Sequence, residues 1–182
     1  MGGLETFGYN ILKNFRIKNK ETYSIVNKKG NKNLPFFFVY SLIKSLHIIN
    51  AKEIEAIYLS DGILSPFGVI IKKLTNKKIA ITLHGKEVTY NNKIYQKIMS
   101  NLINKLDLVL CVSNQTKKEA IKIGVDERKV YVTNNGINPL EFLLNKPKSL
   151  LKNKLFSKFR IQSNNRKILF TNGRLVKRKG VR

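Results

Sequence analysis

Residues 78–87 have the sequence KIAITLHGKE, a short apolar run that ends at a polar turn. The run predicts a buried strand over 78–83, and the turn at His84-Gly85 ends it. A helix is predicted next over 93–105, followed by a second buried strand over 107–112. A strand, a helix and a strand at this spacing predict parallel strands joined by a right-handed crossover.

The same alternation continues along the chain in both directions. Further strands are predicted over 21–28, 55–59, 129–133 and 167–171, and further helices over 5–18, 35–50, 66–74, 114–123 and 148–159. We therefore predict an α/β fold, a Rossmann-like parallel sheet with helices on both faces. Ligands of such sheets bind at the carboxyl ends of the strands. Three polar turns fall there: Ser60-Asp61-Gly62, His84 to Glu87, and Cys111 to Ser113.

The composition indicates a folded and strongly basic chain. Its 182 residues are 42% hydrophobic, which is enough for a core. The 35 Lys and Arg residues outnumber the 11 Asp and Glu residues, and the net charge is +24. Such an excess favours anionic partners, namely nucleic acid, acidic lipid or nucleotide phosphates. The basic residues are dispersed rather than clustered, so we do not expect nucleic acid as a partner.

The cysteine count and the N-terminus predict a cytoplasmic protein. Cys111 is the single cysteine, which excludes an internal disulfide, and its apolar neighbours predict a buried side chain rather than a nucleophile. Met1-Gly2-Gly3 lacks the basic start and apolar run of a signal peptide.

The two ends of the chain carry glycine turns that suit phosphate binding. Residues 168–180, ILFTNGRLVKRKG, predict a buried strand, a Gly-Arg turn and the cationic start of a helix. Gly2-Gly3-Leu4-Glu5 predicts a glycine loop leading into a helix. Such a loop normally follows a strand, so we expect the sheet to lack its first strand.

These pieces, in this order, resemble the glycosyltransferase family 4 enzymes of the GT-B fold. The matching segments are Gly2 to Thr6, His84 to Glu87, Val112-Ser113, Lys117 to Ala120, Gly124-Val125, Lys129-Val130, Asn135 to Asn138 with Phe142, and Leu169 to Gly180. The resemblance implies two Rossmann-like domains, the first holding the acceptor and the second a nucleotide-sugar donor. It implies transfer with retained anomeric configuration and no metal or other cofactor. We expect an incomplete acceptor-side domain over 1–140, a linker and basic helix over 141–165, and a truncated donor-binding domain over 166–182.

The resemblance also implies roles for individual residues. Arg174 and Lys179 match the cations that bind the donor diphosphate, and Gly2 and Gly3 match the loop that approaches the phosphates. His84 matches the histidine of the acceptor cleft and is the candidate catalytic residue. The remaining acceptor-side candidates are Glu87, Asp61 and Ser113, although helix capping also explains Ser113.

Two features depart from the family pattern. Asn138 stands where the family usually has Asp, and no Glu-x7-Glu motif follows residue 166. We therefore expect an incomplete and inactive piece of a glycosyltransferase. The alternatives are a non-catalytic or split-enzyme subunit that pairs with a separately encoded C-terminal domain, and a basic nucleic-acid-binding module. A Rossmann oxidoreductase is disfavoured because no Gly-x-Gly-x-x-Gly follows a strand.

The resemblance leaves open whether the acceptor is a glycan or lipid-linked. A peripheral position at the inner membrane face fits the second, because an apolar segment with Lys44 in it suits an anionic leaflet. The apolar residues of this segment are Phe36, Phe37, Phe38, Ile43 and Leu46. Ordinary packing of the helix against the sheet also explains them and is the interpretation we favour.

Overall fold

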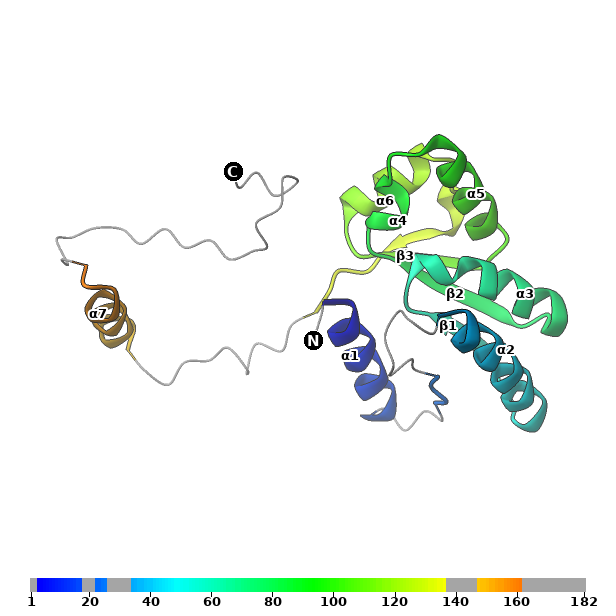
Figure 1. Ribbon diagram of the computed structural model, residues 1–182, viewed down its shortest axis with the longest axis horizontal. Coiled ribbons are helices and arrows are strands. Elements are labelled where there is room, and N and C mark those ends of the chain that lie inside the picture. Colours follow the sequence, from blue (N-terminus) through cyan, green and yellow to red (C-terminus); the bar gives the residue numbers. More distant parts are fainter. Residues whose placement is uncertain (1–2, 18–21, 26–33, 137–146, 162–182) are drawn as a thin grey trace. The chain divides into compact units, whose positions relative to one another are not determined.

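The computed structural model describes residues 3–17, 22–25, 34–136 and 147–161. The chain divides into two compact units, 1–136 and 137–182. The first holds a parallel sheet and its helices, and the described part of the second holds one helix, α7 (Lys148–Phe159) (Figure 1). The predicted domain limits at 140 and 165 remain predictions.

Four parallel strands form the sheet, in the order β1-β2-β3-β4. The strands are β1 (Ala56–Leu59), β2 (Lys78–Leu83), β3 (Leu108–Cys111) and β4 (Val130–Val132). Leu83 pairs with Cys111, and Cys111 pairs with Val132, so the strands end together at one edge. This edge is called the carboxyl edge, and the opposite one the amino edge. The predicted α/β fold with a parallel, Rossmann-like sheet is confirmed.

The helices of the first unit alternate with the strands (Figure 1). They are α1 (Gly3–Ile17), α2 (Leu34–Ala51), α3 (Ser65–Thr75), α4 (Lys86–Thr89), α5 (Lys93–Asn104) and α6 (Asn114–Lys122), with short 3-10 turns η2 (Gly62–Leu64) and η3 (Glu127–Lys129). These bounds agree with the predicted helices, to which the structure adds α4 and the two 3-10 turns. Residues 22–25 form no strand, while the rest of the strand predicted over 21–28 and that over 167–171 lie outside the described residues.

The core lies on one face of the sheet because alternate strand residues point to the same side. Ile79, Ile81 and Leu83 of β2 are buried there, next to Val109 and Cys111 of β3. Helices α3, α5 and α6 add apolar side chains to the same cluster. The tightest approach is at Gly68 of α3, where an added Cβ would lie 2.6 Å from Leu59 Cδ1. This packing fixes the strand ends relative to one another.

Helix α2 is apolar on two sides. Phe38 and Leu46 pack against the core, and the Phe38 ring meets that of Phe67 edge-on at 5.6 Å. These two side chains therefore pack as the sequence favoured, whereas Phe36 and Ile43 remain exposed. None of the described helices combines the length and hydropathy needed to cross a bilayer.

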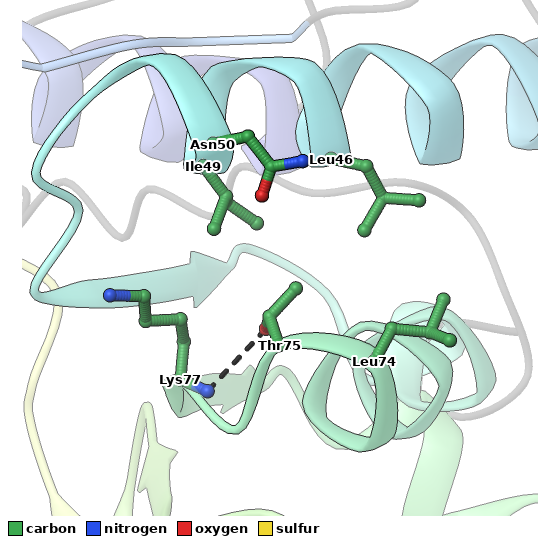
Figure 2. A pocket seen from close by; sticks show the side chains of 6 residues that line it. All are labelled: Leu46, Ile49, Asn50, Leu74, Thr75 and Lys77. Carbon is green, nitrogen blue, oxygen red and sulfur yellow. Dashed lines mark hydrogen bonds between the residues drawn. The ribbon is translucent and has the colours of Figure 1, made fainter.

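A surface hollow of ≈ 600 Å³ lies between the C-terminal parts of α2 and α3 (Figure 2). Leu46, Ile49, Asn50, Leu74, Thr75 and Lys77 line it. Lys77 immediately precedes β2, so this hollow is at the amino edge. It is thus separate from the polar turns at which a ligand of a parallel sheet is expected.

Candidate functional site

The turns after β1 and β2 meet at the carboxyl edge. The Nε2 atom of His84, which follows β2, lies 2.9 Å from the carbonyl oxygen of Ser60, which follows β1. Because a carbonyl only accepts, Nε2 carries the hydrogen and donates it. In the neutral imidazole, Nδ1 is then the acceptor. His84 can therefore accept a hydrogen bond from a hydroxyl that enters the edge.

Glu87, in the first turn of α4, ties these two turns together. Its Oε1 atom accepts the backbone N–H of His84 at 3.1 Å and that of Gly62 at 3.4 Å. The side chain is 6% exposed, and its buried Oε2 atom has no hydrogen-bond donor among the described residues. Gly62 fits against it closely, since an added Cβ would lie 2.8 Å from Glu87 Cγ.

Asp61 belongs to the turn after β1 and caps η2. Its Oδ1 atom accepts the backbone N–H of Ile63 at 3.1 Å. Burial raises the pKa of the Asp61 carboxyl, and the negative charge of Glu87 raises it further, against the Ile63 hydrogen bond and His84. The structure thus brings Asp61, from the turn after β1, together with His84 and Glu87, from the turn after β2, as expected of strand ends at one edge.

Ser113 lies at the same edge, after β3, but its hydrogen bonds are those of a helix cap. Its Oγ atom accepts the backbone N–H of Thr116 at 3.1 Å and lies 3.0 Å from the Thr116 hydroxyl. The predicted cap of α6 is confirmed, as is Gly124 after the helix, with φ +97°.

Cys111 is fully buried, as its apolar neighbours indicated. Burial, and then the charge of Glu87, raise the pKa of its thiol to about 11, with Lys117 opposing. The sulfur is a neutral thiol at pH 7, which agrees with the predicted packing role.

Two aromatic side chains of the site were not identified as functional in the sequence. Phe7 of α1 meets the His84 ring edge-on, with ring centroids 4.8 Å apart. Tyr95 of α5 has a raised pKa, through burial and then the charges of Glu87 and Asp61. Phe7 stood out only as a member of a helical apolar stripe, and Tyr95 carried no signal that distinguishes it from a packing residue.

The predicted donor-side residues are mostly not described. Gly2, Arg174 and Lys179 lie outside the described residues, and Gly3 is the first residue of α1. In the described part of the chain, no group of three His, Cys, Asp or Glu residues is arranged to hold a metal ion.

A parallel α/β sheet with convergent polar turns at its carboxyl edge defines a Rossmann-like domain. The chain belongs to Glycosyltransferase Family 4, whose profile matches residues 2–140. The resemblance found in the sequence is thereby confirmed. No curated protein matches the chain.

Solved glycosyltransferases share the fold over most of this chain. Anabaena Alr3699/HepE, crystallised with UDP-glucose, matches with TM-score 0.63 and 14% identity over 88% of this chain and 47% of its own. The same protein with UDP and glucose matches with TM-score 0.61 and 16% identity, over 87% of this chain and 47% of its own. A glycosyltransferase from Rickettsia africae matches with TM-score 0.51 and 22% identity, over 85% and 40%. The chain therefore spans less than half the length of these proteins.

Proposed function

We propose that this chain forms the acceptor side of a glycosyltransferase that moves a sugar from a nucleotide-sugar donor to a hydroxyl, with retained configuration. The observation that carries the proposal is the His84 imidazole at the carboxyl edge. It is held by Ser60 through Nε2 and leaves Nδ1 to accept a hydrogen bond. An acceptor hydroxyl bound there is oriented for attack on the sugar carbon.

The donor side supplies the other half of the chemistry. As the bond from the sugar carbon to the diphosphate oxygen breaks, negative charge grows on the leaving group. The acceptor oxygen bonds to the sugar carbon and gives up its proton to Nδ1 of His84, and the diphosphate leaves with the electron pair of the broken bond. Arg174 and Lys179 are the residues we assign to that charge, with Gly2 and Gly3 lining the approach to the phosphates. No metal is assigned to this reaction, and the roles of Glu87 and Asp61 are on the acceptor side, whereas the hydrogen bonds of Ser113 are those of a helix cap.

A chimera tests this proposal directly. Residues 1–136 are joined to the second half of Anabaena HepE, and transfer of label from UDP-glucose to an extract of glycans and lipids is measured. We expect His84→Ala to lower transfer by about 100-fold, the lower range for a positioned proton-accepting group. His47→Ala is the matched control, since His47 is the other histidine and lies exposed on α2. Full activity of the His84 variant would exclude the proposed role.

We further propose that the 182-residue chain alone does not transfer sugar, because it spans only about half of the solved relatives. The second half is then supplied by another segment or by a separately encoded domain. The same assay with the purified chain tests this, and sustained turnover contradicts it. A defined complex with a second polypeptide, recovered from the source cells, is the result expected of a split enzyme.

An exposed apolar stripe on α2 favours a lipid-linked acceptor and contact with an anionic membrane. Phe36, Val39, Tyr40 and Ile43 recur at helical spacing, and Phe36 and Ile43 are 76% and 64% exposed. The net charge of +24 attracts the chain to acidic lipids.

Co-sedimentation with phosphatidylglycerol vesicles at low salt tests the membrane contact. We expect Ile43→Glu to abolish binding and Ile94→Glu, at an equally exposed site on α5, to weaken it only slightly. Equal loss in both variants indicates a charge effect without a docking face. Tight binding to duplex DNA that vesicles cannot compete with favours the basic nucleic-acid-binding module instead.

A further inference from the structure

Two carboxyl groups at the carboxyl edge, those of Asp61 and Glu87, have unequal surroundings. Glu87 Oε1 accepts two backbone N–H groups, whereas the buried Oε2 has no donor among the described residues. The Asp61 side chain accepts one backbone N–H at Oδ1, and Asp61 immediately precedes Gly62, which packs against Glu87. A hydrogen bond between two carboxyl groups requires a proton, since ionised carboxylates only accept.

Of these two carboxyl groups, Asp61 is the better placed to hold such a proton. The two backbone N–H groups on Glu87 Oε1 favour the ionised form of Glu87, while Asp61 has one such bond. A hydroxyl on Asp61 also satisfies Glu87 Oε2, which is otherwise a buried acceptor without a partner.

We propose that Glu87 is the positioning residue of the His84 turn, and that its second oxygen is satisfied by a proton held on Asp61. With the proton bound, the pair carries one negative charge, and Asp61 donates to Glu87 Oε2. When the proton leaves to solvent, the pair carries two charges, and the link between the turns after β1 and β2 weakens. The positioning role of Glu87 rests on the proposed function of His84, whereas the location of the proton does not.

Other titratable and charged groups surround Asp61 and Glu87. Tyr95 of α5 and Cys111 of β3 have raised pKa values, through burial and then the neighbouring carboxylates, so they stay neutral in acidic and neutral solution. His84 acts to lower the pKa of Asp61, and Lys117 of α6 acts to lower that of Cys111, in each case against the larger effect of burial. The raised pKa of Asp61, caused first by its burial, agrees with the proposed proton.

A pair of matched variants of the full chain tests the proton. Asp61 and Asp126 both begin a 3-10 turn and accept the backbone N–H two residues on, each at 3.1 Å. The amide of Asp61→Asn keeps this cap and donates permanently to Glu87 Oε2. Because the pKa of Asp61 is higher in the folded state, its protonated carboxyl stabilises the fold fully below the unfolded pKa of 3.8. This stabilisation is lost as pH rises through the folded pKa. As pH rises from about 4 to 7, the folded-to-unfolded ratio of Asp61→Asn should therefore increase about tenfold relative to that of the wild type.

The Asp126→Asn control should behave oppositely. The hydrogen bond from the Arg128 side chain lowers the pKa of Asp126, so this carboxylate stabilises the fold above its unfolded pKa. As pH rises, the folded-to-unfolded ratio of Asp126→Asn should therefore fall relative to that of the wild type. If Asp61→Asn follows Asp126→Asn, no proton links Asp61 to Glu87.

The imidazole NMR signals test the positioning role without any activity assay. The chain has two histidines, so His47→Gln assigns the remaining signals to His84. We expect Glu87→Ala to shift the His84 signals and broaden Nε2–H by exchange, while Glu87→Gln, which still accepts both N–H groups, preserves them. Unchanged signals in Glu87→Ala would overturn the positioning role. If these signals respond as expected but His84→Ala leaves transfer intact, the proposed function alone fails.

Discussion

The charged groups at the two edges of the sheet differ in how completely they are paired. At the amino edge, Asp107 accepts the backbone N–H of Ile79 at 2.9 Å and pairs with Lys72 at 2.8 Å. Lys129 there donates to two carbonyl oxygens, those of Asn104 at 2.6 Å and Leu106 at 3.0 Å. At the carboxyl edge, by contrast, the buried Oε2 of Glu87 has no donor within the described part of the chain.

The difference shows in two aspartates. Burial acts to raise the pKa of Asp107, but the Lys72 and Ile79 hydrogen bonds outweigh it and leave the pKa lowered. Burial raises the pKa of Asp61, and Glu87 adds to the increase. Paired charges stabilise the fold, whereas incompletely paired acids in one place are typical of a functional site. The acid at the amino edge is thus paired with a cation, whereas those at the carboxyl edge have the surroundings that we propose for a ligand-binding edge.

The largest effect is expected where the carboxyl edge is packed most closely. In Gly62→Ala the new Cβ would lie 2.8 Å from both Glu87 Cγ and Leu83 Cδ2. Because Glu87 is held by two backbone N–H groups, it cannot move away without losing them. We expect the free energy of unfolding in urea to fall by about 2–3 kcal/mol.

Gly8→Ala is the control for this substitution. Gly8 lies within α1, and an added Cβ there meets nothing within 4 Å. Its replacement should raise the free energy of unfolding by up to about 1 kcal/mol, through helix propensity. If Gly62→Ala is as stable as the wild type, the carboxyl edge is loosely packed and the contrast with the amino edge is wrong.

A smaller effect is expected from breaking the ion pair at the amino edge. Asp107→Ala leaves the Ile79 N–H and the Lys72 ammonium without their acceptor, which costs about 1.5–2 kcal/mol at pH 7. A lowered folded pKa adds stability that is present above the unfolded value and lost as pH falls through the folded one. The difference between variant and wild type should therefore shrink below about pH 4.

Lys78→Met is the control for that experiment. Lys78 lies 3.7 Å from Asp107, and its side chain is 79% exposed, so its loss should cost less than about 0.5 kcal/mol. Thermal unfolding between pH 3 and 7 measures all three proteins. A gap for Asp107→Ala that persists unchanged at pH 3 would mean that the ionised carboxylate is not what stabilises this edge.

The amino-acid sequence predicts the elements well where local signals and burial agree. The strand over 78–83 has the predicted bounds, as has α7 over 148–159, because a run of branched apolar residues or a helical pattern decides each. Residues 22–25 form no strand, which the apolar alternation alone did not indicate.

Only the part of the site that follows from the order of strands and turns could be predicted from the sequence. His84, Asp61 and Glu87 follow strands that must end at one edge, so their proximity could be expected. The contact between Phe7 and His84 joins residues far apart in the sequence, and no local pattern encodes it. Likewise, the unpaired Oε2 of Glu87 is a property of burial and hydrogen-bond geometry, which the order of residues does not specify.

The smallest expected effect shows whether Ser113 is a helix-capping residue or a ligand-binding residue. It lies at the carboxyl edge, yet its Oγ atom accepts the Thr116 N–H as a helix cap does. Ser113→Ala should lower the free energy of unfolding by about 1 kcal/mol, and Ser113→Asp should restore it, because aspartate caps equally well. Transfer by the chimera should be unchanged in both variants. Loss of transfer with unchanged stability would instead make Ser113 a ligand-binding residue, and the carboxyl edge would then extend as a site from β1 to β3.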